Sequence, residues 1–208
     1  MAIAIVIFFA IGLHEYAHAK FADMAGDPTP RYYGRVTLNL FNHFDPLGTI
    51  MIALTAITGY GIGWGRPVPV NPSKMRNPRW DHFISVAAGP LTNLVQAVVW
   101  AFVFRFVIAS NQQNEFVYLL ALYGILTNLS LCLFNLIPLG PLDGHWLVGA
   151  FLPDRARDRW YLFNRQYGGI ILLVLVLGGQ FSGIPLLQMI LGPSIHFLFH
   201  LLTGRAFG

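Results

Sequence analysis

The sequence predicts an all-α membrane protein, a polytopic helix bundle with about five crossings and a membrane-associated hairpin that carries short β-strands. The 208-residue chain is 55% hydrophobic and only 11% charged, and its mean hydropathy is +0.57. Soluble domains carry about 25% charged residues. Apolar stretches that approach or exceed the roughly 17–25 residues a spanning helix needs recur at Met1–Ala22, Phe83–Ser110, Phe116–Ile137, Gly168–Gln180 (extendable at both ends) and Ile184–Leu202.

We expect one integral-membrane domain over residues 1–208. Cys132 is the single cysteine and lies in an apolar run, which excludes disulfides and cysteine-based zinc sites within one chain. The net charge is +4 and the pI about 9.5; basic loops in a membrane protein more often record topology, so no nucleic-acid partner is expected. The expected parts are core helices at 1–22, 83–110 and 116–137, a cytoplasmic insert at 23–79, and C-terminal helices within 168–203.

The first apolar segment contains a motif that a membrane helix would not normally tolerate. Its start resembles a signal-peptide core, but no basic region precedes it and no clear cleavage site follows, so we interpret it as a retained helix. His14, Glu15 and His18 then match H-E-x-x-H. Residues four apart share one helix face, so both imidazoles can bind one zinc ion while Glu15 acts on its water. Ionisable groups inside a membrane segment indicate a functional site.

Two simpler explanations of the motif are weaker. Chance would produce it in roughly one of several hundred chains of this composition. Two histidines satisfied by neighbouring carbonyl groups would leave the glutamate unexplained.

A catalytic zinc ion takes three protein ligands and a water, so a third ligand is required. The stretch LFNLIPLGPLDGHWL follows a long apolar helix and is interrupted by prolines and glycines. Broken backbone at membrane depth is tolerated only where it is buried in protein or lines a cavity, which favours Asp143. Spacing alone leaves these candidates open: Asp23, Asp27, His43, Asp45, Asp81, His82, Asp143, His145, His196 and His200.

Together the two stretches resemble the site-2 protease family of intramembrane zinc metalloproteases. That family carries H-E-x-x-H on one core helix and an N-P…L-D-G pattern on another. The second pattern is found here as Asn135, Pro138, Leu142, Asp143 and Gly144. The stretch SVAAGPLTNLV, with Gly89 and Asn93, is similar to the family's middle core helix, and GRPVPVNPSKMRNPR looks like the linker of small bacterial and archaeal members.

The resemblance implies roles for individual residues. His14, His18 and Asp143 are the implied Zn²⁺ ligands, Glu15 the implied general base, and Asn135 the polar residue near the reacting carbonyl. His145 stands where many members have a small residue, as a hydrogen-bond donor beside the site or as an alternative ligand. No segment resembles a PDZ or CBS domain, so we expect a minimal member.

The segment Leu47–Trp64 determines the topology. The histidines and Asp143 both follow long apolar runs, so they meet only if their helices run in the same direction with one crossing between them. Leu47–Trp64 should therefore dip in and return, or lie buried as a hairpin. Five crossings also place twelve of the thirteen Lys and Arg residues on one face and leave Arg105 near the other, which makes the zinc end cytoplasmic and places the N-terminus outside.

The insert between the first two crossings contains two stretches expected to be extended. Arg31–Phe41 alternates and is rich in Val, Thr and Tyr, which predicts a strand. Arg66–Pro72 reads as an edge segment because its prolines confine a strand to an edge. Such an edge could pair with an unwound substrate, or form a plain surface hairpin. The substrate-contacting candidates are Asn93, Val68 and Val70.

We therefore expect an intramembrane zinc endopeptidase that cleaves within or near transmembrane helices, in regulated intramembrane proteolysis. A metal-ion transporter and a catalytically inactive scaffold are the alternatives. The expected location is the plasma membrane of a prokaryote, with the active site toward the cytoplasm. The expected partners are a single-span membrane-protein substrate and the lipid bilayer, and a homo-oligomer stays open. His196 and His200 repeat the four-residue spacing without a glutamate and are expected to be packing or interfacial residues.

Overall fold

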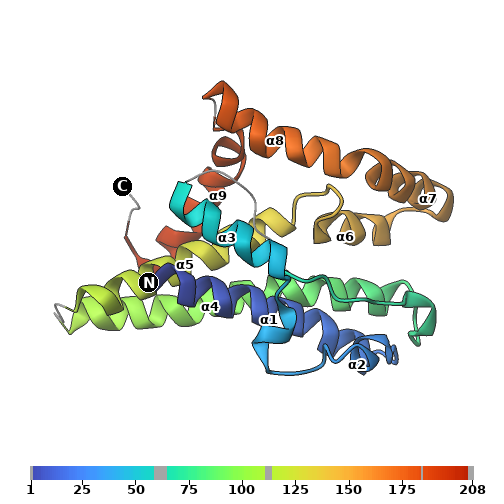
Figure 1. Cartoon of the computed structure of the whole chain (residues 1–208), viewed down its shortest axis with the longest axis horizontal. Helices are drawn as coiled ribbons and strands as arrows, with labels where there is room; N and C mark the ends of the chain where they lie inside the picture. Colours follow the sequence, from blue (N-terminus) through green and yellow to red (C-terminus); the bar gives the residue numbers. More distant parts are fainter. Residues whose placement is uncertain (1, 59–64, 111–113, 184, 206–208) are drawn as a thin grey trace.

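Three long helices form the base of the molecule. The structure, a computed structural model, describes residues 2–58, 65–110, 114–183 and 185–205. Helices α1 (Ala2–Met24), α4 (Trp80–Ala109) and α5 (Glu115–Asn135) pack side by side. α1 and α5 run in the same direction, and α4 runs against them (Figure 1). The ends of α1 and α5 therefore point the same way, as the topology argument requires.

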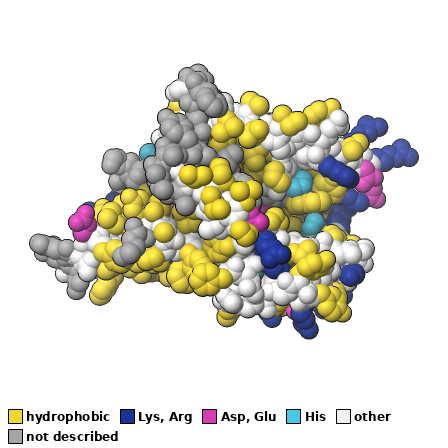
Figure 2. Space-filling model, viewed as in Figure 1, with side chains coloured by type: hydrophobic (Ala, Val, Ile, Leu, Met, Phe, Trp, Pro, Cys, Tyr) yellow, Lys and Arg dark blue, Asp and Glu magenta, His cyan; other side chains and the backbone are white. Residues whose placement is uncertain are grey.

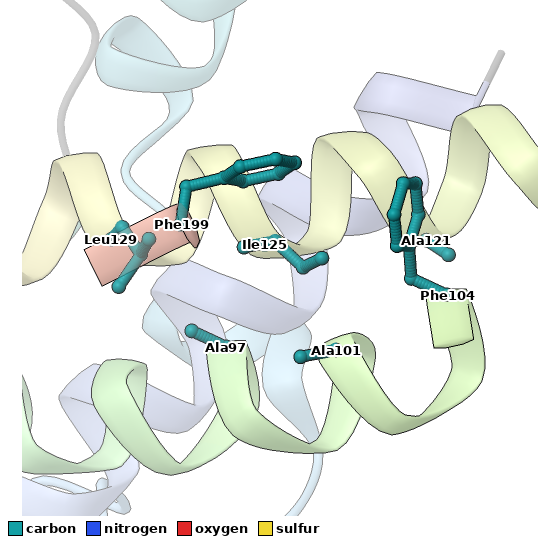
Figure 3. Close-up of a cluster of buried hydrophobic side chains, with 7 residues drawn as sticks. All are labelled: Ala97, Ala101, Phe104, Ala121, Ile125, Leu129 and Phe199. Atoms are coloured by element: carbon teal, nitrogen blue, oxygen red, sulfur yellow. The ribbon is translucent and has the colours of Figure 1, made fainter. Parts of the chain in front are cut away.

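Small side chains let α4 and α5 approach closely. Ala97 and Ala101 of α4 face Ile125 and Leu129 of α5 in a buried cluster (Figure 3). The cluster also contains Phe104, Ala121 and, from α9 (Leu186–Thr203), Phe199. In a membrane, close contact through small residues replaces the hydrophobic effect as the source of helix association. The cluster fixes α4, and α4 supplies the groups that orient the first two candidate ligands.

Among the described residues, five helices are long and apolar enough to cross a membrane: α1, α4, α5, the stretch Asp154–Gly178 and α9. The chain is therefore an integral membrane protein with the five candidate crossings that its sequence predicts. The fourth crossing begins earlier than expected. The alternating charges of Asp154–Trp160 suggest a solvated or headgroup-contacting loop. This stretch instead lies within α7 (Asp154–Phe163), which continues through a π-helical turn (Asn164–Gly168) into α8 (Gly169–Ser182).

The predicted strand over Arg31–Phe41 is wrong, and the described residues contain no strand. The insert instead folds into α2 (Thr29–Tyr32), turns, and a 3₁₀ helix at Leu40–His43. Gly34 turns the chain at φ +66°, and Arg35 is then buried at 2% exposure. Its guanidinium donates to the carbonyl oxygens of Arg66 and Pro67. The Arg35 side chain reaches these carbonyl oxygens because the chain turns at Gly34. The alternating residues therefore do not form a strand of a sheet.

The segment Leu47–Trp64, predicted to dip into the membrane and return or to lie buried as a hairpin, is flanked by residues that meet. α3 (Pro46–Thr58) has 13 residues and so is about 20 Å long, short of the roughly 30 Å of a bilayer core. Phe44 and Gly65 form an isolated antiparallel bridge, and Arg66 N donates to His43 O at 2.8 Å. The two ends therefore meet, which fits both a segment that dips in and returns and a buried hairpin. Its residues 59–64 lie outside the described part.

Basic side chains gather at one end of the molecule. In Figure 2 the dark blue groups lie mainly over α2 and α7, beyond the end of α1 that carries the H-E-x-x-H motif. Arg31 and Arg155 are exposed at this end, and Arg157 pairs with Asp154 at 2.8 Å. This distribution is the one that the positive-inside tendency associates with the cytoplasmic face.

Candidate metal centre

Three side chains converge where α1 meets the start of α6 (Asp143–Phe151). His14 Nε2 lies 3.0 Å from His18 Nε2. Asp143 Oδ2 lies 3.3 Å from the first nitrogen and 3.4 Å from the second. The three atoms form a nearly equilateral triangle, and both imidazoles are buried.

The hydrogen bonds of the two imidazoles fix where their protons are. His18 Nδ1 lies 2.8 Å from the backbone oxygen of Ser85, which can only accept, so Nδ1 carries the proton. His14 Nδ1 lies 2.6 Å from Asn93 Oδ1. The Asn93 amide nitrogen donates at 3.0 Å to a backbone carbonyl of α1 and to Asn128 Oδ1, which identifies Oδ1 as the acceptor. Both Nε2 lone pairs therefore point into the triangle.

This arrangement fits a tetrahedral zinc ion. Zinc–ligand bonds of 2.0–2.1 Å separate neighbouring ligand atoms by about 3.3 Å. Two bare nitrogens 3.0 Å apart repel each other unless a cation lies between them. Asp143 Oδ2 is buried and, among the described residues, has no hydrogen-bond partner, and a carboxylate in that state indicates a place for a cation.

Glycine 89 allows the histidines to lie against α4. A Cβ at this position would overlap the His18 imidazole and lie 2.8 Å from His14 Cε1. Asn93, one helical turn further along α4, is fully buried and hydrogen-bonds to His14. This placement behind the histidines does not fit the expectation that Asn93 contacts substrate. It makes Asn93 the residue that orients His14, and such partners of metal-binding histidines fix their tautomer.

Glu15 lies between the triangle and the extended segment Arg66–Pro72. A Cβ at Gly65 would lie 3.2 Å from Glu15 Oε1, so the carboxylate lies over this glycine. Arg35 holds the next two residues of the segment through their carbonyl oxygens. Burial lowers the pKa of the Arg35 guanidinium, and the negative charge of Glu15 acts in the opposite direction. The buried guanidinium thus joins two parts of the insert, and its charge favours the negative charge of Glu15.

A cavity of about 560 Å³ opens beside these groups. In Figure 2 histidine side chains (cyan) are visible in a hollow of the surface, between the part formed by α6, α7 and α8 and the three long helices. Most of the exposed cavity wall is apolar, and the lining includes Val68 and Val70 of the extended segment and Asn135 at the end of α5. The Asn135 amide nitrogen donates to Leu131 O at 3.0 Å. Of the predicted substrate-contacting residues, Val68 and Val70 face the cavity.

The remaining candidate ligands lie outside the triangle. His145 Nδ1 donates to the Leu142 carbonyl, its ring packs against Trp146, and burial lowers its pKa. His43 is fully buried and donates to Thr37 O, while Asp27 is fully buried and accepts from Asn71 N at 2.6 Å. Among the described residues, the triangle is the one group of three such side chains close enough to share an ion.

Several residues that shape the site were not singled out from the sequence. Asn128 binds Asn93, which orients His14, and the Ser85 carbonyl accepts from His18. Arg35 and Asn164 hold backbone segments near the site. Asn128 could have been noticed as a polar residue inside an apolar helix. The other contacts join distant parts of the chain and leave no local pattern.

The comparisons with known proteins point to the same chemistry. The chain is 35% identical over 178 residues to the "Putative zinc metalloprotease YwhC" of Bacillus subtilis (strain 168), a match that covers 83% of this chain and 78% of the relative. No protein-family model matches the chain, and no solved structure matches it. With the His14, His18 and Asp143 cluster in the arrangement of the H-E-x-x-H…D motif, this relationship identifies the chain as a member of the site-2 protease family of zinc metalloproteases.

Proposed function

We propose that the protein is an intramembrane zinc endopeptidase with His14, His18 and Asp143 as its metal ligands. One observation carries the proposal: three donor atoms lie 3.0–3.4 Å apart, and the protons of both imidazoles are on the opposite nitrogens. The substrates would be single-span membrane proteins cut within or near their transmembrane helices. The site would open toward the cytoplasmic side of a prokaryotic plasma membrane, on the side where the basic residues gather.

Glu15 is the proposed general base. A zinc ion held by the three ligands would lower the pKa of a bound water to about 7 and polarise the scissile carbonyl group. Glu15 directly follows His14 and lies three residues before His18 in the chain, and its carboxylate lies over Gly65, at the edge of the cavity. From there it would take a proton from the water and return it to the leaving amine.

Asn135 is the proposed donor to the developing oxyanion. It lines the same cavity, and its amide nitrogen uses one donor on the Leu131 carbonyl of its own helix. An amide nitrogen has two donors, so one stays available to an oxyanion in the cavity. A preorganised donor of this kind stabilises the transition state more than the ground state.

The extended segment Arg66–Pro72 is the proposed docking edge for the unwound substrate. In the described part of the chain, no hydrogen bond uses the backbone N–H or C=O of Val68 or Val70. Pro67 and Pro69 have no N–H, so these two valines supply the free donors along the cavity. A substrate strand paired there would pass Gly65 and the Glu15 carboxylate, and residues that weaken its helix would favour unwinding.

The first experiment measures bound zinc and cleavage of a single-span test substrate by the purified chain in detergent. We expect wild type to bind about one zinc ion and to cut the substrate. Glu15→Gln should keep the zinc and lose cleavage, because the amide cannot accept the proton. Asp143→Ala should lose most of the zinc, because it removes one of three ligands.

The control results separate this function from its alternatives. Asp154→Ala, a substitution on the exposed end of α7, should keep both zinc and activity. Cleavage by Glu15→Gln would remove the general base from the proposal. Zinc binding without cleavage of any substrate, together with metal uptake into vesicles that hold the protein, would favour a transporter.

A backbone substitution tests the docking edge. Val70→Pro removes one of the two free N–H groups while keeping an extended backbone available. We expect cleavage to fall by about tenfold, the effect of one lost hydrogen bond of about 1.4 kcal/mol, with zinc content unchanged. Val70→Ala keeps the N–H and is the matched control. Equal cleavage by the proline and alanine variants would mean that substrates do not pair with Val70.

A further inference from the structure

The loop that carries Asp143 is irregular and joins two helices. Between the end of α5 at Asn135 and the start of α6 at Asp143, the chain forms no regular helix. The carboxylate is the one proposed ligand that does not lie inside a long helix. Its distance from the imidazoles therefore depends on what holds this loop.

A side chain from the helix that follows α6 binds this loop directly. Asn164 Oδ1 accepts a hydrogen bond of 2.7 Å from Gly140 N. Its amide nitrogen donates to Trp160 O at 3.0 Å, one helical turn earlier. Asn164 is 2% exposed, so both ends of its amide are used inside the protein. A buried pair of this kind is costly to break because it leaves a backbone N–H without a partner.

Gly168 packs against the same loop residue, Gly140, through its backbone. A Cβ at this position would lie 2.6 Å from Gly140 O and 2.9 Å from Gly140 N. Gly168 is buried, whereas the next residue, Gly169, is exposed and would place a Cβ within 4 Å of nothing. Asn164 and Gly168 are the first and last residues of the π-helical turn. π-Helical turns are rare in proteins, and those that occur are often found at functional sites.

Further contacts hold the other side of Asp143. Trp160 Nε1 donates to His145 O at 2.8 Å, and the Tyr161 ring fills the space beside Gly149. The chain is therefore attached to α7 and the π turn both three residues before Asp143 and two residues after it.

We propose that Asn164 and Gly168 are positioning residues for the metal ligand Asp143. They hold Gly140 in place, so that the carboxylate stays 3.3–3.4 Å from the two imidazole nitrogens before any metal binds. Without this attachment the loop would sample other conformations, and metal binding would have to order it. The proposal rests on the ligand set of the proposed function.

Adjacent glycines provide a matched pair of variants. Both Gly168 and Gly169 have helical dihedral angles (φ −56° and −64°), so alanine is compatible with the backbone at each. Gly168→Ala would push the loop away at Gly140, while Gly169→Ala would touch nothing. Asn164→Ala removes the acceptor by an independent route and keeps the test usable if one variant does not fold.

Zinc affinity is measured on the full chain in detergent by competition with a chelator, and coordination is measured from the visible absorption of the cobalt-substituted protein. We expect Gly168→Ala and Asn164→Ala to bind zinc about 10–100-fold more weakly than wild type, with an altered cobalt spectrum. Gly169→Ala should match wild type in both. Thermal unfolding of the metal-free proteins reports any general loss of stability, which by itself would not change the cobalt spectrum.

Wild-type affinity and spectrum in both Gly168→Ala and Asn164→Ala would overturn the positioning role while leaving the ligand set intact. Equal weakening in Gly169→Ala would also overturn it, because that variant does not touch the loop. A wild-type chain that binds no zinc would instead overturn the proposed function and this inference with it.

Discussion

The two sides of the metal triangle are held in different ways. On the histidine side, each ligand ring is itself hydrogen-bonded to α4, through Asn93 Oδ1 and the Ser85 carbonyl. On the aspartate side, Oδ2 has no hydrogen-bond partner among the described residues, and the protein instead holds the backbone around Asp143. One side orients the ligand atoms, and the other orients the chain that carries the ligand.

This difference predicts graded consequences. A change on the histidine side alters the ligand atoms directly, so metal affinity and fold are lost together. A change on the aspartate side loosens the loop before Asp143. The carboxylate can still reach the metal, but metal binding must then order the loop, which weakens the affinity. We therefore expect the largest combined losses of zinc affinity and stability at Gly89 and Asn93 in α4, and the smallest at Arg79, which holds the far end of α6.

The largest effect is expected from Gly89→Ala. The added methyl group would overlap the His18 ring and press on the His14 ring, and both belong to a buried helix contact. Overpacking of this kind costs about 1–3 kcal/mol of the free energy of unfolding. Because the displaced atoms are the ligands, zinc content should also fall to near zero.

Gly178→Ala in α8 is the control for Gly89→Ala, since its Cβ would meet only Val174 Cγ1 at 3.8 Å. It should keep its zinc and gain slightly in helix stability. Full zinc content in Gly89→Ala would show that α4 can yield around the histidines, and the contrast between the two sides would weaken.

Asn93→Ala is expected to have the next largest effect. It leaves the Nδ1 proton of His14 and Asn128 Oδ1 without their buried partner, at a cost of about 1–3 kcal/mol in stability. Loss of the group that orients a metal-binding histidine weakens metal affinity about 10–100-fold. Chelator competition measures the affinity and thermal unfolding measures the stability.

Asn128→Ala is the comparison, because Asn128 binds Asn93 and does not contact the histidine. We expect it to lose stability but to keep most of the zinc affinity. An Asn128→Ala variant as weak in zinc binding as Asn93→Ala would show that the amide chain acts as one unit.

The histidine side of the triangle was easier to predict from the sequence, because its two ligands lie four residues apart in one short motif. Spacing of four on a helix brings His14 and His18 together, and the apolar runs predict the five crossings. Asp143 was favoured by a different argument, from broken backbone at membrane depth, while spacing alone left ten candidates open. The H-E-x-x-H motif also assigned a role to Glu15, and the resemblance to a known family then added Asn135.

What the sequence did not reveal depends on contacts between distant segments. Arg31–Phe41 alternates as a strand does, but the burial of Arg35 against Arg66 and Pro67 requires turns. The alternating charges at the start of α7 suggested a solvated or headgroup-contacting loop, whereas contacts with α6, such as that of Trp160 with His145, dock this segment as a helix. Neither contact has a period or a spacing that a pattern could detect.

The smallest effect is expected from Arg79→Ala, which tests the aspartate side from the far end of α6. The Arg79 guanidinium donates to Ala150 O at 2.6 Å and to Leu152 O at 2.9 Å, where α6 ends. Because Arg79 is partly exposed, water can replace it on these carbonyls, and we expect a stability loss of about 1 kcal/mol. Zinc affinity should fall by about threefold or less, since a loosened α6 end still leaves Asp143 fixed through Gly140.

Arg159→Ala, on an exposed part of α7, should change neither stability nor zinc affinity. If Arg79→Ala weakened zinc binding as much as Asn93→Ala, then α6 would transmit disorder along its whole length to Asp143. The far end of α6 would then be as tightly coupled to the metal as the histidine side, even though no hydrogen bond reaches Oδ2 within the described chain. A threefold effect would instead mean that the carboxylate is positioned locally, by the backbone contacts on either side of it.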